Sequence, residues 1–197
     1  MTSPDTALRL VIDALNRIGI PFMAGGSLAS SIHGVVRATQ DIDLVVKLRP
    51  PQVDQLVAEL GQAFYADTGM IRSALAAGRS FNLIHYATGY KFDLFPLKAD
   101  AYYELQFHRR VIEHPVVFDA EFELPVATAE DTILAKLAWY RAGGEVSERQ
   151  WNDVRGVILV QRNRLDLDYM RRWAKHLEVG DLLDRVLREC AAELSAE

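Results

Sequence analysis

Residues 21–46, PFMAGGSLASSIHGVVRATQDIDLVV, decide the fold. The apolar residues 21–24 predict a short strand, which runs into Gly25-Gly26-Ser27 and a helix of small residues over 28–33. At Asp41-Ile42-Asp43-Leu44 polar and apolar residues alternate and the stretch then becomes fully apolar, which predicts a second strand entering a core. The order strand, glycine loop, helix, strand indicates a mixed α/β domain.

The rest of the chain extends this domain and then becomes helical. Apolar spacing predicts a helix over residues 6–18, and Thr88-Gly89 joins two β-rich runs into a hairpin. From Thr128 the pattern stays helical, with capping signals that begin two of the helices. We therefore predict an α/β (α+β) fold with a short mixed β-sheet flanked by helices in residues 1–126, and a bundle of about four helices in residues 127–197. The other predicted elements are helices after Pro50-Pro51, near 70–77 and over 100–107, the hairpin strands 81–86 and 90–97, and edge strands over 111–114 and 121–125.

Three aspartates are candidate metal ligands. Asp41 and Asp43 are two residues apart on one strand, so both carboxylates point to one face, about 6.5 Å apart. That spacing suits a divalent cation, Mg²⁺ or Mn²⁺, but also an ordinary strand with one solvated face. Asp93 occupies a polar position between Phe92 and Leu94 of another predicted strand, and a third carboxylate favours the metal site.

Other residues are candidates for binding phosphate. Gly25, Gly26 and Ser27 precede a helix N-terminus, where backbone N–H groups attract phosphate, although such a run is also a common turn. Lys136 can reach a β- or γ-phosphate as a point charge, or can be an ordinary surface lysine. Arg37 and Thr39 fit either phosphate binding or ordering of the loop before the strand.

Taken together, Gly25-Gly26-Ser27, Arg37-x-Thr39 and Asp41-Ile42-Asp43-Leu44 resemble the signature of the DNA polymerase β-like nucleotidyltransferases. Residues 130–137 and 153–155 are similar to the C-terminal motifs of the AbiEii/MenT-like toxin nucleotidyltransferases. The resemblance implies that Asp41, Asp43 and Asp93 bind metal and act in catalysis with Lys136. It also implies a nucleotide-binding set of Gly25, Gly26, Ser27, Arg37, Thr39, Lys136 and Asp153.

The expected activity is metal-dependent transfer of a nucleotide from a nucleoside triphosphate (NTP) to an acceptor hydroxyl. The residues leave three acceptors open: the 3′ end of a tRNA, a protein side chain, and a small molecule. The resemblance adds the possibility of a toxin paired with an antitoxin partner. A noncatalytic nucleotide-binding or interaction module with the same fold is the alternative, since a fold does not fix a function.

Composition limits the class of protein further. The formal net charge is −5 over 197 residues, which argues against indiscriminate nucleic-acid binding. Basic residues gather in one C-terminal stretch, between Arg149 and Lys175, which is either a set of solvated helix faces or an RNA-binding surface. Cys190 is the only cysteine, so a metal would need carboxylate or histidine ligands. No apolar run approaches the roughly 20 residues that span a bilayer, and the N-terminus lacks a signal pattern, so we expect a cytoplasmic protein with no membrane partner.

Overall fold

The computed structural model describes residues 4–39, 41–114 and 123–195. Its contacts divide the described chain into two compact units. The sheet unit comprises Met1–Gly25 and Thr39–Val126, and the helical unit comprises Gly26–Ala38 and Ala127–Glu197. The sheet unit ends at Val126 and the helical unit resumes at Ala127. Residues 26–38 group with the helical unit because their helix contacts two of its helices.

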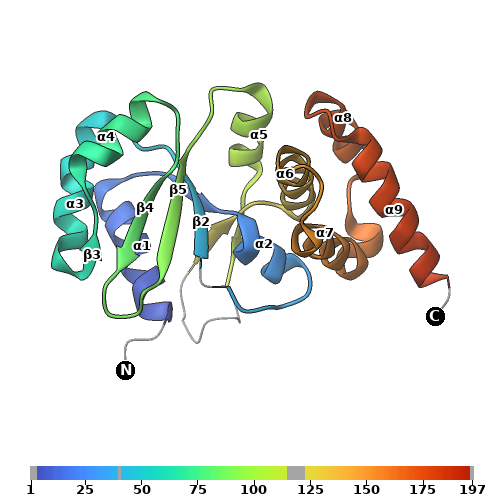
Figure 1. Cartoon of the computed structure of the whole chain (residues 1–197), viewed down its shortest axis with the longest axis horizontal. Helices are drawn as coiled ribbons and strands as arrows, with labels where there is room; N and C mark the ends of the chain where they lie inside the picture. Colours follow the sequence, from blue (N-terminus) through green and yellow to red (C-terminus); the bar gives the residue numbers. More distant parts are fainter. Residues whose placement is uncertain (1–3, 40, 115–122, 196–197) are drawn as a thin grey trace. The chain divides into compact units, whose positions relative to one another are not determined.

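The sheet unit alternates helices with short strands (Figure 1). Its elements, in chain order, are α1 (Pro4–Ile18), β1 (Phe22–Ala24), β2 (Asp41–Val46), η1 (Pro50–Gln52), α3 (Val53–Leu60), η2 (Gly61–Ala63), β3 (Phe64–Tyr65), α4 (Thr68–Ala76), β4 (Phe81–His85), β5 (Lys91–Pro96), α5 (Ala101–Arg109), β6 (Val111–Glu113) and β7 (Leu124–Val126).

Among the described residues the strands form one seven-stranded sheet in the order β3-β4-β5-β2-β1-β7-β6. The sheet is mixed, since β2 pairs with β5 and β1 with β7 in parallel, whereas the other neighbours are antiparallel. This arrangement confirms the predicted mixed α/β fold. The hairpin of β4 and β5 is also confirmed, with Phe81 opposite Leu94.

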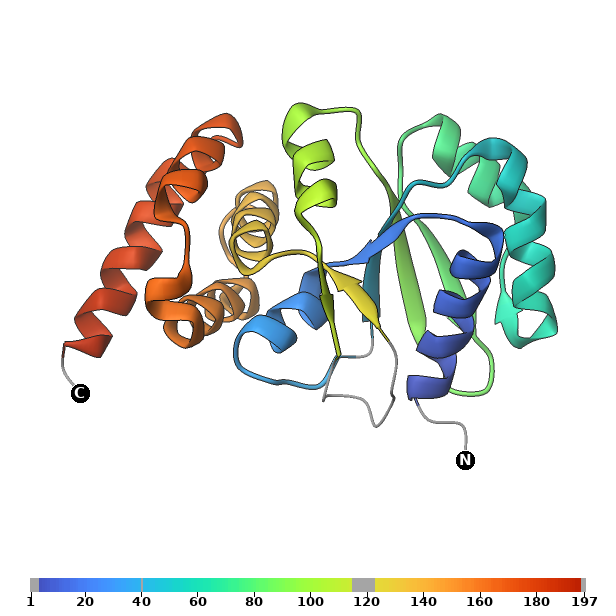
Figure 2. The ribbon, with the colours of Figure 1, turned by 180° about the vertical axis from the view of Figure 1, so that it is seen from behind.

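Alternation along the strands separates a buried face from a polar one. Ile42 and Leu44 of β2, and Phe92 and Leu94 of β5, are fully buried. Helix α1 buries Leu8, Val11 and Leu15, whose spacing places them on one side of the helix. The same helix lies behind β4 and β5 in Figure 1 and in front of them in Figure 2, so it covers one face of the sheet.

Two details of the sheet differ from the sequence-based expectation. Strand β7 lies between β1 and β6, so it is not an edge strand; only β6 of that pair lies at an edge. Residues 121 and 122 of the strand expected over 121–125 lie outside the described residues. The edge strand β3 has two residues, Phe64 and Tyr65, too few to show the alternation that identifies a strand in a sequence.

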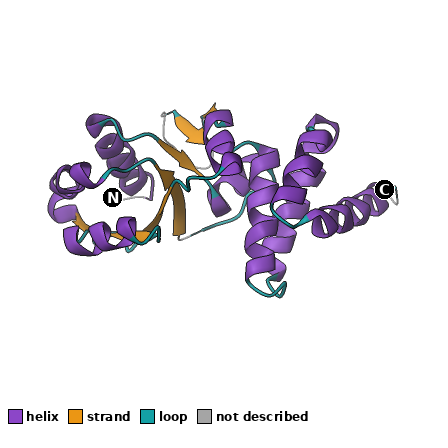
Figure 3. Cartoon of the chain, turned by 90° about the horizontal axis from the view of Figure 1, so that it is seen from above, coloured by secondary structure: helices purple, strands orange, loops and turns teal. Residues whose placement is uncertain are grey.

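The described part of the helical unit contains helices and loops only (Figure 3). Thr128 and Ser147 cap α6 and α7 through their side chains, as the capping signals predict. The helices of this unit are α2 (Gly26–His33), α6 (Ala129–Ala142), α7 (Glu148–Gln161), η3 (Arg162–Arg164), α8 (Leu167–His176) and α9 (Gly180–Leu194).

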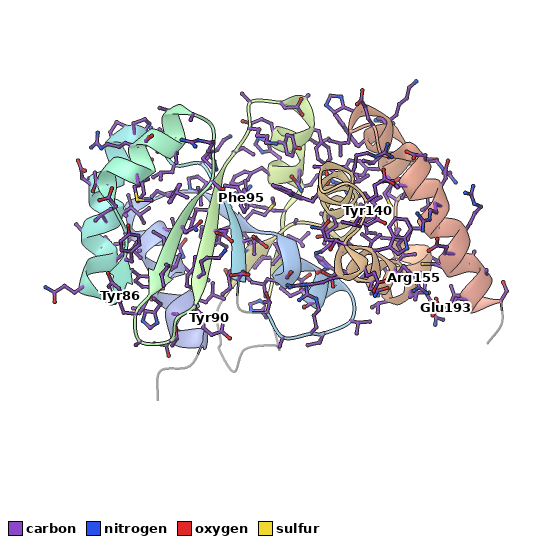
Figure 4. All side chains as sticks on the ribbon, in the orientation of Figure 1. Tyr86, Tyr90, Phe95, Tyr140, Arg155 and Glu193 are labelled. Atoms are coloured by element: carbon purple, nitrogen blue, oxygen red, sulfur yellow. The ribbon has the colours of Figure 1, made fainter. Side chains whose placement is uncertain are left out.

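Helix α2 approaches α7 closely at a pair of glycines. A Cβ on Gly34, just after α2, would lie 2.8 Å from the backbone nitrogen of Val157 and 2.9 Å from the carbonyl carbon of Gly156. Only glycine fits there. On the other side of α7, Arg155 and Glu193 of α9 point toward each other and form an ion pair (Figure 4). No helix in the described residues is both long and apolar enough to cross a membrane.

Candidate functional site

The predicted metal ligands share one face of the sheet unit. Strands β2 and β5 run parallel with Asp41 opposite Lys91 and Asp43 opposite Asp93. Residues that lie opposite each other on neighbouring strands point to the same face, so all four side chains lie on the face opposite the buried Ile42. The structure therefore brings Asp41, Asp43 and Asp93 onto one partly exposed surface.

Lys91 is the feature of this face that the sequence analysis missed. Its Nζ lies 2.9 Å from Oδ2 of Asp93 and 3.4 Å from Oδ1 of Asp41. The hydrogen bond to Asp93 raises the pKa of Lys91; burial acts in the opposite direction, and the charges of Asp93 and Asp41 add to the increase. The sequence signal was present, because Lys91 and Asp93 are two apart on one strand and must share a face.

Within residues 4–39, 41–114 and 123–195, no three histidine, cysteine, aspartate or glutamate side chains converge as a group that could hold a metal ion. The chemistry of the face nevertheless suits a hard cation. Asp41 and Asp93 already share one cation, the Lys91 ammonium group, and carboxylate oxygens are the ligands that Mg²⁺ and Mn²⁺ prefer. The donor atoms on this face are thus of the kind that a divalent ion binds, and two of the three carboxylates contact the Lys91 ammonium group.

The glycine loop is tied to the same strand. The N–H of Gly25 donates to the carbonyl oxygen of Asp43 at 3.0 Å. Gly26 has a φ of 53°, in the left-handed region that favours glycine, so the turn into α2 requires this residue. Thr39 donates its hydroxyl to the carbonyl oxygen of Asp41 at 2.9 Å, which supports the loop-ordering role for Thr39.

A cluster in which positive charges predominate lies in the helical unit, centred on Asp153 of α7. The guanidinium group of Arg37 donates to both carboxylate oxygens of Asp153, from Nε and Nη2, at 2.7 Å each. Lys136 of α6 donates from Nζ to Oδ2 at 2.8 Å. The side chains of Lys136 and Asp153 are only 8% and 9% exposed, so this pair is shielded from bulk water.

Ser27 joins this cluster from the first turn of α2. Its Oγ lies 2.6 Å from Nη2 of Arg37 and 3.3 Å from Nη2 of Arg149, and both nitrogens are donors. Two arginines and a lysine therefore surround one serine and one carboxylate. Four of the predicted nucleotide-binding residues, Ser27, Arg37, Lys136 and Asp153, therefore lie together in the structure.

The charge state of Asp153 reflects its partners. Burial would raise the pKa of this carboxyl, but the hydrogen bonds from Arg37 and Lys136 and their positive charges outweigh it, so the pKa is lowered. Asp153 is thus ionised and holds two cations in fixed orientations. We name Ser27, Arg37, Lys136, Arg149 and Asp153 the cationic cluster.

The rest of the basic C-terminal stretch is used in several ways. Arg155 pairs with Glu193, and Arg171 lies 3.8 Å from Asp168. Arg162 and Arg164 donate to main-chain carbonyl oxygens at the end of α7. Arg172 and Lys175 are exposed on α8.

No protein-family profile and no curated protein matches this chain. Two solved structures share its fold along nearly its whole length. ANT(2'')-Ia in complex with adenylyl-2''-tobramycin is 14% identical over 90% of this chain and 98% of its own, with a TM-score of 0.54. An antigenic nucleotidyltransferase-like protein from Paracoccidioides brasiliensis is 14% identical over 95% of this chain and 94% of its own, with a TM-score of 0.53. The chain therefore has the fold of the nucleotidyltransferases.

Proposed function

We propose that this protein transfers a nucleotidyl group from an NTP to an acceptor hydroxyl, with a divalent metal ion. The observation that carries the proposal is the register of β2 and β5, which sets Asp43 opposite Asp93 and Asp41 on the same face. The nucleotidyltransferase fold supports the reaction class. In the reaction the acceptor oxygen forms a bond to the α-phosphorus, the bond between that phosphorus and the bridging oxygen breaks, and pyrophosphate leaves with the electron pair.

The sheet unit supplies the carboxylates. Asp41, Asp43 and Asp93 would hold Mg²⁺ or Mn²⁺, and the ion would neutralise charge on the phosphates when bound. Asp93, which is less exposed than Asp41, would accept the proton of the acceptor hydroxyl. Ile42 and Leu44 anchor the strand in the core, so these carboxylates are held on a rigid element.

The helical unit supplies the cations. Lys136 and Arg37 would bind the β- and γ-phosphates together with the Ser27 hydroxyl and the start of α2. Asp153 is a positioning residue in this proposal, because it fixes both cations through three hydrogen bonds. The side chains of Arg37, Lys136 and Asp153 together carry one net positive charge, which suits an anionic ligand.

We propose a hydroxyl of a small molecule as the acceptor. The support is the similarity, over 90% of the chain, to ANT(2'')-Ia, a protein solved with adenylyl-2''-tobramycin. An RNA 3′ end is the second candidate, favoured by the exposed basic residues of α8, Arg171, Arg172 and Lys175. A protein acceptor and pairing with an antitoxin rest on the sequence resemblance alone.

The test is incubation of the full chain with each α-labelled NTP, Mg²⁺ or Mn²⁺, and one acceptor class at a time: hydroxylated small molecules, total RNA, or total protein. We expect label on a small molecule, dependent on the metal and lost in Asp41→Asn. Label on RNA ends would select the second candidate. Tight NTP binding without transfer to any class would instead show a noncatalytic nucleotide-binding module.

A further inference from the structure

The ammonium group of Lys91 lies where the carboxylates of the sheet unit would bind a cation. Its Nζ contacts Asp93 at 2.9 Å and Asp41 at 3.4 Å, so it bridges two strands. Both distances are within the ion-pair range, and the strand register sets Asp41 directly opposite Lys91. One side chain therefore satisfies two of the three proposed metal ligands.

The contacts of Lys91 also change the charge of the carboxylate face. Asp41, Asp43 and Asp93 together carry three negative charges when ionised, and like charges on one face repel. Lys91 offsets one of these charges in the chain as it stands. A divalent ion that uses Asp41 and Asp93 must either displace the ammonium group or bind close to it, and unit charges of the same sign about 4 Å apart repel measurably even in water.

An ordinary surface ion pair in the same unit provides a comparison. Lys47 pairs with Glu104 at 2.9 Å, with both side chains 41% exposed. The Lys91 side chain is 37% exposed but Asp93 only 18%, and Lys91 touches two carboxylates instead of one. Lys47 is thus a matched lysine whose ion pair is with Glu104 and not with Asp41, Asp43 or Asp93.

We propose that Lys91 is an internal counter-ion that competes with the divalent metal for Asp41 and Asp93. Metal alone binds weakly while the ammonium group lies between these carboxylates, and Lys91 therefore sets the metal affinity of the protein. The inference rests on the proposed function, because it assumes that the same carboxylates hold the metal.

The experiment titrates the full chain with Mn²⁺ alone, without nucleotide, and follows the free Mn²⁺ signal by electron paramagnetic resonance. Lys91→Met and Lys91→Gln should each bind Mn²⁺ at least about tenfold more tightly than the original chain. Lys91→Arg keeps the charge and should bind within about twofold of the original chain, and so should Lys47→Met. Circular dichroism spectra verify that each variant is folded. If Lys91→Met does not fold, Lys91→Gln provides the measurement.

The outcomes separate the inference from the proposed function. Unchanged or weaker Mn²⁺ binding by both Lys91 variants overturns the competition, and if Asp41→Asn and Asp93→Asn still weaken binding, the metal site itself stands. Unchanged binding in the aspartate variants overturns the metal site and the inference with it. Tighter binding in Lys47→Met as well would show a general charge effect and would also overturn a specific role for Lys91.

Discussion

Asp153 accepts hydrogen bonds from both Nε and Nη2 of Arg37, 116 residues earlier in the chain, at 2.7 Å each. This bidentate contact joins the loop after α2 to α7. Bidentate arginine–carboxylate pairs fix direction as well as distance. The position of Arg37 in the cationic cluster therefore depends on Asp153.

Removing the charge of Asp153 should be costly. Asp153→Asn leaves Arg37 and Lys136 without the carboxylate that both contact, and breaking such a buried pair costs about 3–5 kcal/mol. Urea denaturation at pH 7 measures the loss. Asp181→Asn, which removes an exposed aspartate paired with Arg141, should change the free energy of unfolding little. Equal effects of the two substitutions would contradict the role given to Asp153.

The same carboxyl should make stability depend on pH in the acid range. Its pKa is lower in the folded chain than the ordinary value of 3.8, so its stabilising contribution is present above that value and is lost as the pH falls through the folded pKa. The difference in unfolding free energy between the original chain and Asp153→Asn should therefore shrink below about pH 4. A constant difference from pH 7 to pH 3 would argue against an ionised, hydrogen-bonded Asp153.

Lys136 should distinguish nucleotides by their phosphates. If Lys136 contacts the β- and γ-phosphates, Lys136→Ala should weaken NTP binding by about 1.5–3 kcal/mol, the scale of a charge-assisted hydrogen bond, and nucleoside monophosphate binding much less. Calorimetry with each ligand makes the comparison, and Lys175→Ala on the exposed face of α8 is the control. Equal losses for both ligands would place Lys136 away from the triphosphate.

Sequence alone predicted the elements whose pattern is local. Alternation along β2 identified Asp41 and Asp43, and the hairpin turn identified β4 and β5. The features that the sequence did not predict depend on contacts between segments that are far apart in the chain. The register of β2 against β5, which sets Asp41 opposite Lys91, cannot be predicted from the sequence of either strand alone.

The hydrogen bonds of the cationic cluster could not be predicted from the sequence either. Family motifs selected Arg37, Lys136 and Asp153, but their hydrogen bonds join residues 17 and 116 positions apart. Spacing along the chain cannot show that one carboxylate holds both cations. The place of α2 in the helical unit depends likewise on Gly34 and Gly156, whose close approach appears only when the helices are packed.

Gly34 should tolerate no side chain. A Cβ there would lie under 3.0 Å from three backbone atoms, of Val157, Gly156 and Ser30, none of which can rotate away. Gly34→Ala should therefore destabilise the protein by about 1–3 kcal/mol or more, the range for overpacking. Gly180→Ala, where the added Cβ meets nothing within 4 Å, should be close to neutral by thermal melting. A neutral Gly34→Ala would contradict the close approach of α2 and α7.

If an RNA 3′ end is the acceptor, its binding should depend on salt concentration. If exposed residues of α8 contact phosphates, RNA affinity should fall with salt concentration, with a log–log slope of about −0.7 for each contact. Reversing Arg171 and Arg172 to glutamate should weaken RNA binding and flatten that slope, with NTP binding unchanged. Arg188→Glu on α9 is the control. Salt-independent binding, or none at low salt, would leave these residues as a solvated helix face.

Nucleotidyl transfer is proposed to depend on a metal ion held by the carboxylates of β2 and β5. The most direct measurement is the rate of transfer of label from an α-labelled NTP under limiting Mg²⁺, for Asp43→Asn against Asp54→Asn, which removes an exposed aspartate from the same unit. We expect Asp43→Asn to lose at least about a hundredfold in rate while circular dichroism shows an unchanged fold, and Asp54→Asn to keep its activity. Transfer by Asp43→Asn at the rate of the original chain would contradict the account.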